Sequence, residues 1–291
     1  MSDVGCKTER VGGGIATAIA GVALAGLVVP PWRRRPPGIE RGAPSGIVDL
    51  TDVPGQFRRY AVSAFGDPVP AYDTAVIWGR ARVREVGRSP WLHARATTYH
   101  RLGEAFVGDF PLTWFGVAVG GGRDANVDGH GVSSLFGKRG PAAPELDRSS
   151  NTFMWLEAGL FPPTWRHPGV RLEEVDAATV RLWYPPHDEP IIWRLDAAGM
   201  PVRLEAIRPK GAGRPPVPQW IDLGPWRSYD GFRWFSSATV TWSDEARPWL
   251  RWRIDGVEPG ADVDRSIDDI RAELRSDVTR TDASAVVPAR V

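Results

Sequence analysis

The stretch FRWFSSATVTW at residues 232–242 decides the fold of this chain, because its apolar side chains recur with a period of two. Successive side chains of a β-strand point to opposite faces of a sheet, so this period predicts one buried face and one polar face. The apolar side of the predicted strand holds Phe232, Trp234, Ala238, Val240 and Trp242. Such a strand is typical of an antiparallel sheet that packs on a core with one face.

The same alternation recurs in other parts of the chain. It is found in TAVIWGRARVREV (74–86), ATVRLWY (178–184), IIWRLD (191–196), VRLEA (202–206) and WLRWRID (249–255). Glycine-containing segments at 196–201 and 229–232 separate neighbouring runs, and glycine supplies the positive φ that tight hairpins need. The sequence therefore predicts an α+β, mostly β fold with hairpin-linked antiparallel strands.

Two helices are expected to accompany this sheet. The segment TDVPGQFRRYAVSAF (51–65) has Thr51 or Asp52 as its candidate cap and an apolar stripe at helical spacing. The segment PELDRSSNTFMWLEAGLFPPTW (144–165) also has apolar residues at helical spacing before two consecutive prolines stop the run. We expect this second helix to cover the sheet.

The N-terminal segment has the composition of a membrane segment or a signal peptide. Residues 11–32 carry no charge, and 15–29 are apolar enough for a short span or for the core of an export signal. An A-x-A sequence at 23–25 favours cleavage and export, whereas three arginines at 33–35 favour an uncleaved helix with a cytoplasmic flank. The orientation stays open, and a buried apolar helix is a further alternative. We expect the membrane to be the partner of 11–30, in a membrane-anchored or exported protein of the cell envelope.

The chain divides into four predicted regions. These are the N-terminal tail with the membrane segment or signal peptide at 1–30, a linker rich in proline and arginine at 31–50, the antiparallel β domain at 51–258, and a short helix with a loose tail at 259–291. Ser266 is the expected cap of the last helix, which should end near Val278.

Composition excludes several classes of function. The chain has 36 basic and 35 acidic residues, so no global field would recruit nucleic acid. The lone Cys6 excludes an internal disulfide and a cysteine-based structural zinc site. The five histidines are scattered, and no nucleophile elbow, dinucleotide fingerprint or phosphate loop occurs. We therefore expect no metal, no cofactor and no catalytic motif.

The segment DANVDGHG at 124–131 reproduces the opening of a calcium-binding loop. Counting from Asp124, position twelve is Leu135, where the loop requires a bidentate glutamate. Two extended runs meet instead at Asp128 and Gly129, a pair that favours a tight hairpin turn. The sequence predicts the hairpin.

Four segments carry a resemblance to a known family: AVIWGRARV, RDANVDGHGVSSLFGKRG, the segment 144–165 and WRSYDGFRWFSSATVTW. Over about residues 53–256 the chain resembles an uncharacterised bacterial family, a domain of unknown function common in actinobacteria. Its arrangement is similar to the LolA-like lipoprotein-localisation half-barrels, which hold acyl chains in an apolar concavity. The resemblance implies a curved antiparallel half-barrel covered by one or two helices, to which the apolar segment at 11–30 would add an N-terminal apolar helix. It supplies no active residues.

Charged residues also occur within or beside the apolar segments. Glu157 lies among apolar neighbours, and burial would raise its pKa. The base rate for buried glutamate favours instead a position at the helix edge, in water or paired with an arginine. Arg80, Arg82 and Arg84 project from one strand face, where Asp and Glu of neighbouring strands would make a solvated charged surface.

The leading prediction is a lipid-like or apolar small molecule held in a cavity between the sheet and the helix at 145–161. The expected wall consists of Trp114, Phe115, Phe153, Trp155, Leu156, Glu157, Leu160 and Phe161. Two alternatives remain: an enzyme that uses Glu157, His100 or His130 for proton transfer, and a non-catalytic structural module with a solid core.

Overall fold

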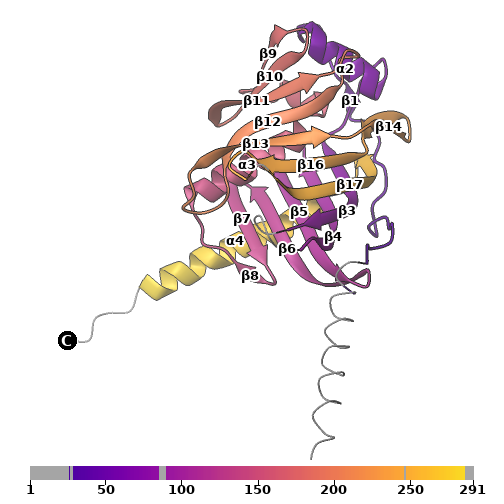
Figure 1. Cartoon of the computed structure of the whole chain (residues 1–291). Coiled ribbons are helices and arrows are strands. Elements are labelled where there is room, and N and C mark those ends of the chain that lie inside the picture. Colours follow the sequence, from indigo (N-terminus) through magenta and orange to yellow (C-terminus); the bar gives the residue numbers. More distant parts are fainter. Residues whose placement is uncertain (1–25, 27–28, 85–89, 246, 286–291) are drawn as a thin grey trace, which may run out of the picture.

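The computed structural model describes residues 26, 29–84, 90–245 and 247–285 (Figure 1). Its helices are α2 (Gly55–Phe65), α3 (Pro144–Ala158), the short 3-10 helix η1 (Pro162–Arg166) and α4 (Asp264–Ala285). The main sheet contains β3 (Thr74–Val83), β4 (Leu92–Arg101), β5 (Ala105–Trp114), β6 (Val117–Val127), β7 (His130–Leu135), β8 (Lys138–Arg139), β9 (Arg171–Asp176), β10 (Thr179–Tyr184), β11 (His187–Leu195), β12 (Pro201–Pro209), β13 (Pro216–Leu223), β16 (Ser237–Trp242) and β17 (Pro248–Pro259). Two small sheets pair β1 (Gly46–Ile47) with β2 (Pro70–Ala71) and β14 (Trp226–Tyr229) with β15 (Phe232–Phe235).

The main sheet is a single open antiparallel sheet of 13 strands. Its order is β8-β7-β6-β5-β4-β3-β17-β16-β13-β12-β11-β10-β9, so most neighbours are joined by hairpins. The sheet bends around α3, which contacts β6 and β7 near one edge and β12 toward the other (Figure 1). The predicted mostly β fold and the half-barrel are confirmed.

The stretch that decides the fold forms two strands where one was expected. Phe232 to Phe235 pair with β14 in a separate hairpin, and the chain enters the main sheet only at Ser237. The alternation breaks because Trp234 and Phe235 are consecutive and both buried. The ring of Phe232 stacks on that of Phe65 in α2, with ring centroids 5.7 Å apart. The strand β15 thus packs against α2 and lies outside the main sheet.

The concave face carries the larger core. The helix α2 packs near β9 and β15, with its predicted apolar stripe buried, and its Tyr60 hydroxyl donates to the Leu160 carbonyl at 2.8 Å. The predicted cap of this helix is wrong: Pro54 precedes its first turn, and Thr51 bonds to the Asp49 carboxylate. The helix α3 fills the curve, as predicted, and places its apolar side chains in the same core.

A second, smaller core lies on the convex face. It joins Trp78 of β3 to Ile267 and Ile270 of α4 and to Ile39, within the predicted linker. That linker segment packs on the domain, since Arg41 pairs with the buried Glu258 at 2.6 Å.

The C-terminal helix is longer than predicted. It begins at Asp264, whose N–H donates to the Asp262 carboxylate, so Ser266 lies inside the helix and is not its cap. The helix continues to Ala285, where a loose tail was expected after Val278.

The predicted membrane segment or signal peptide at 11–30 lies almost entirely outside the described residues. None of the helices in the described ranges is long and apolar enough to cross a membrane.

The packing of α4 on the convex face gives a first prediction. Ile270 is fully buried, so Ile270→Ala should lower the free energy of unfolding by about 2–5 kcal/mol, the usual cost of deleting buried methyl and methylene groups. The matched control is Ile207→Ala. Because Ile207 on β12 is 41% exposed, this variant should lose far less free energy of unfolding. Denaturant unfolding of both variants measures the difference. An equal loss of unfolding free energy in both variants would show that the packing of α4 on the sheet does not stabilise the fold.

Candidate functional site

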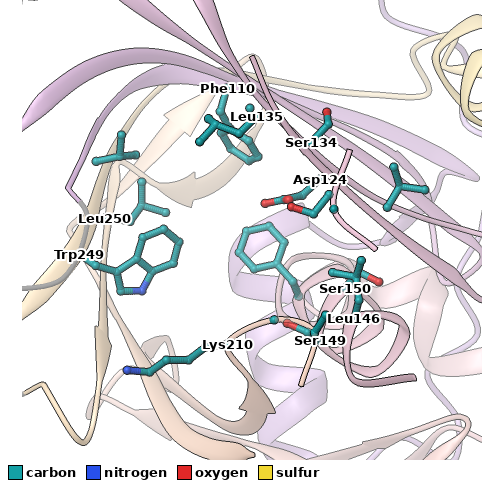
Figure 2. A pocket seen from close by; sticks show the side chains of 18 of the residues that line it. Phe110, Asp124, Ser134, Leu135, Leu146, Ser149, Ser150, Lys210, Trp249 and Leu250 are labelled. Carbon is teal, nitrogen blue, oxygen red and sulfur yellow. The ribbon is translucent and has the colours of Figure 1, made fainter. Parts of the chain in front are cut away.

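A cavity of about 570 Å³ opens on the concave side of the sheet. Figure 2 shows Trp249 and Leu250 of β17 on one wall, facing Asp124 of β6 and Ser134 of β7 across the space. The start of α3 closes one end with Leu146, Ser149 and Ser150 (Figure 2). The cavity therefore lies where the two halves of the bent sheet and α3 meet.

The walls of the cavity are largely apolar. The aromatic and aliphatic side chains that line it are those of Val83, Phe106, Phe110, Leu112, Val132, Leu135, Leu146, Phe153, Trp242, Trp249 and Leu250. Pockets of 300–1,000 Å³ with apolar walls and a few polar groups are typical of small-molecule sites.

Arg208 is the main polar group of this cavity. It is only 8% exposed, and its guanidinium donates to the Gln219 amide oxygen at 2.9 Å and to the Ser149 hydroxyl at 2.8 Å. The same group lies over the rings of Phe153 and Trp242. Burial lowers the pKa of Arg208 to about 10, so the side chain is still cationic at neutral pH. Within the described ranges no carboxylate lies within ion-pair distance of it.

Lys210 and Asp124 add charge around Arg208. Lys210 pairs with Asp244 at 2.9 Å and with Glu245, so its charge is balanced. The Asp124 side chain is exposed to the cavity. The surrounding walls desolvate its carboxyl and raise its pKa, whereas the hydrogen bond with Ser133 and the charge of Arg208 lower it. Among the described residues, Arg208 is thus a buried cation whose hydrogen-bond partners are neutral, and Asp124 acts on it only through its charge.

Glu157 is buried, against the prediction that it would lie at the helix edge or pair with an arginine. It is 5% exposed, and its Oε2 lies 2.8 Å from His100 Nε2 and accepts a hydrogen bond from the Thr98 hydroxyl at 2.9 Å. The reason is strand register: Thr98 and His100 are two residues apart on β4 and face the concave core beneath α3. Polar partners on the same face thus satisfy the buried acid.

Aromatic rings separate this polar cluster from the cavity. The ring of His100 lies 5.3 Å from that of Phe106, which lies 5.3 Å from that of Phe153, and only the two phenylalanines line the cavity. His130, the other candidate for proton transfer, is exposed at the start of β7. The geometry does not place either histidine or Glu157 in the cavity.

The predicted wall residues fall into three groups. Phe153 lines the cavity, while Leu156 and Glu157 line with it a much smaller space of about 20 Å³. Trp155, Leu160 and Phe161 are buried in the aromatic core instead. Trp114 and Phe115 are about 40% exposed and lie at the turn between β5 and β6, outside the cavity.

The sequence did not identify the strand residues that line the cavity, above all Arg208. It follows Leu204 and Ala206 at alternate positions on β12, and both are buried in the core. A charged residue in phase with an apolar strand face was the available signal.

The segment 124–131 forms the predicted hairpin. Asp128 and Gly129 have φ angles of 53° and 82°, as a tight turn between β6 and β7 requires. Asp128 pairs with Arg271 of α4 at 3.0 Å. No group of three or more His, Cys, Asp or Glu side chains placed to hold a metal occurs in the described part of the chain.

Residues 46–253 match the family of unknown function DUF6544. The chain belongs to this family. A comparison with curated proteins found no significant match.

Several solved structures are similar to this DUF6544 chain. A LolA superfamily protein from Nitrosomonas europaea has a TM-score of 0.45 at 7% identity, over 72% of this chain and 94% of that one. A putative outer membrane lipoprotein-sorting protein domain from Vibrio parahaemolyticus has a TM-score of 0.40 at 13% identity, over 64% and 85%. A DUF1329 family protein from Desulfovibrio piger has a TM-score of 0.32 at 10% identity, over 70% and 91%.

The raised pKa of Asp124 gives a prediction about pH. The folded protein holds this proton to higher pH than the unfolded chain, so ionisation of Asp124 lowers stability as the pH rises above its ordinary pKa of 3.8. Because the Asp124 side chain is exposed to the cavity and water screens its charge, Asp124→Asn should raise the free energy of unfolding at pH 7 only slightly, and the gain should shrink as the pH falls toward 3.8.

Asp128→Asn is the matched control, because the hydrogen bond from Arg271 lowers the pKa of Asp128. This variant should lose stability at pH 7, and the loss should shrink on acidification. Chemical unfolding of both variants at several pH values tests the opposite signs. A loss of stability at pH 7 in Asp124→Asn would contradict the assignment.

Proposed function

We propose that this protein binds an elongated apolar molecule with an anionic head group, such as a fatty acid, in the concave cavity at a membrane surface. The observation that carries the proposal is Arg208, a buried cation at an apolar cavity with no carboxylate at ion-pair distance among the described residues. Burying an unpaired charge costs free energy, and a bound anion would offset that cost.

The apolar walls of the cavity would pack against the hydrocarbon part of such a ligand. Each buried methylene contributes about 0.8 kcal/mol, so a chain of about ten carbons supplies several kcal/mol without directional contacts. The rings of Phe106, Phe110 and Trp249 offer that surface in a space of about 570 Å³. This volume also favours a binding protein over a structural module with a solid core.

The head group would meet the Arg208 guanidinium, whose remaining N–H groups are available because the Ser149 hydroxyl already donates to the Pro209 carbonyl. A guanidinium binds a carboxylate through two parallel hydrogen bonds, which are stronger than neutral ones. Proton-transfer chemistry has less support, because Phe106 and Phe153 stand between the His100–Glu157 pair and the cavity. Binding without covalent change is the function that these contacts favour.

Replacing Arg208 tests this proposal. The unmodified protein should bind dodecanoate more tightly than dodecanol, and Arg208→Met should lose that preference by roughly tenfold or more, since a hydrogen bond to a charged group contributes about 1.5–3 kcal/mol. Displacement of a fluorescent fatty acid measures both affinities.

The stability of the same variant provides a second readout. Arg208→Met should change the free energy of unfolding by no more than about 1–3 kcal/mol, because removal of a buried charge offsets the loss of the hydrogen bonds to Gln219 and Ser149. Arg203→Met is the control, since Arg203 pairs with Asp222 at 2.6 Å and does not line the cavity. Equal binding of acid and alcohol by the unmodified protein would remove the head-group role.

The membrane part of the proposal is supported by an exposed apolar surface, here termed the hairpin-tip patch. Its members are Trp114, Phe115, Val117, Val119, Leu135 and Phe136, which are 39–64% exposed. Contiguous exposed apolar surface marks interaction sites. The Phe115 N–H donates to the Gly26 carbonyl at 2.7 Å, so the patch lies where the predicted membrane segment joins the domain. Leu135 belongs to both the patch and the cavity wall, which would let a lipid enter from the bilayer.

Site-directed labelling tests the patch in the full chain. Val117→Cys in a Cys6→Ser background, labelled with an environment-sensitive dye and reconstituted in phospholipid bilayers, should show blue-shifted emission that a lipid-phase quencher reduces. Val202→Cys is the control, because Val202 is also exposed but lies on β12. The same emission from both positions would exclude the patch as the membrane-facing surface.

A further inference from the structure

The outer face of the central strands carries basic residues directly opposite one another. The register of β17, β3 and β4 places them in two rows, here termed the arginine grid: Arg253, Arg80 and Arg95 in one row, and Arg251, Arg82 and His93 in the next. Like charges at directly opposite positions of a sheet are destabilising. Arg253, Arg80 and Arg95 in one row, and Arg251 and Arg82 in the next, therefore lie opposite one another at a cost in stability.

The sequence predicts that acidic residues of neighbouring strands neutralise these arginines, but among the described residues they do so only in part. Of the described residues lining the groove above it, Asp255 is the single carboxylate. The Arg80 guanidinium donates two hydrogen bonds to the Asp255 carboxylate, at 2.8 and 2.9 Å, and Arg33 lies 3.5 Å from the same carboxylate. Arg84 donates instead to the Pro248 carbonyl at 2.7 Å. The surface is therefore strongly cationic.

The members of the grid other than Arg95 line a groove of about 710 Å³. Arg227 of the β14–β15 hairpin and Arg33 of the N-terminal segment also line this groove, which brings the number of lining arginines to six: Arg33, Arg80, Arg82, Arg227, Arg251 and Arg253. The hydroxyls of Ser237, Thr239 and Tyr229 line it too and add neutral hydrogen-bonding groups. The combination of concavity, cations and hydroxyls differs from a flat solvated surface.

An aromatic ring holds part of the grid in place. The Arg82 and Arg251 guanidinium carbons lie 5.6 and 5.0 Å from the centroid of the Trp91 ring. Cation–π contacts of this kind leave the guanidinium N–H groups available to a ligand while reducing the side chain's freedom. The two arginines are thus partly ordered before any anion binds.

We propose that this convex groove binds a multiply charged, phosphate-bearing anion. Guanidinium groups match phosphate oxygens through paired hydrogen bonds, and several of them around one concavity fit a diphosphate or phosphate monoester better than a single carboxylate. The source is either a free small phosphate compound or a phospholipid head group. The groove shares no described lining residue with the concave cavity, so this site stands whether or not the cavity binds a lipid.

Calorimetric titration of the full chain, kept in a neutral detergent, with pyrophosphate tests the groove. Arg82→Gln/Arg251→Gln should weaken pyrophosphate binding by roughly tenfold or more, because charge-assisted hydrogen bonds are lost. The control is Arg194→Gln/Arg203→Gln, which removes the same charge from exposed arginines that are ion-paired on β11 and β12 and should bind almost unchanged.

Two further measurements distinguish a loss of pyrophosphate binding from a change in the fold. Asp255→Asn frees Arg80 and should tighten pyrophosphate binding several-fold. Arg82→Gln/Arg251→Gln should also unfold at a temperature no lower than the unmodified protein, because opposed like charges are removed.

The source is resolved with vesicles of phosphatidylcholine alone or mixed with phosphatidic acid. Pyrophosphate that displaces the protein from phosphatidic acid vesicles supports the groove as a head-group site, and pyrophosphate binding without such competition supports a free phosphate compound. Absence of pyrophosphate binding, or an equal loss of affinity in the control pair, overturns the proposal.

Discussion

The register of the central strands β17, β3 and β4 is the constraint on which both candidate sites depend. Alternate residues face opposite sides, so Leu250, Trp252 and Ile254 enter the concave core while Arg251 and Arg253 face outward. A shift of one residue would exchange these two sets and bury the arginines. The same pairing that encloses an apolar cavity therefore also assembles a cationic groove on the other face, and the two features cannot be separated by small changes in strand pairing.

Much of the architecture could be predicted from local pattern. The period of two identified strands such as 74–83 and 249–255, and the spacing of apolar residues identified the helices at 55–65 and 144–158. Local pattern could not show that β15 lies outside the main sheet, because its contacts with α2, such as that of Phe232 with Phe65, join residues far apart in the sequence.

The candidate site was less predictable, for the same reason. Its walls come from strands whose neighbours are set by long-range register, and Phe153 was the one predicted residue that lines it. Glu157 is buried because β4 supplies Thr98 and His100 beneath it, and no pattern within the helix contains that information. Trp114 and Phe115 are apolar residues at a turn, and composition alone does not distinguish them from core.

The sheet does not close, and the chemistry of its two borders has a consequence for self-association. Unpaired strand edges are templates on which further chains add, unless short length or charge blocks them. The border strand β8 consists of two residues, both basic, and the opposite border β9 carries Arg171, Glu173, Glu174 and Asp176. Solvation of these charges opposes the pairing of copies edge to edge, so the sheet can stay open without nucleating fibrils.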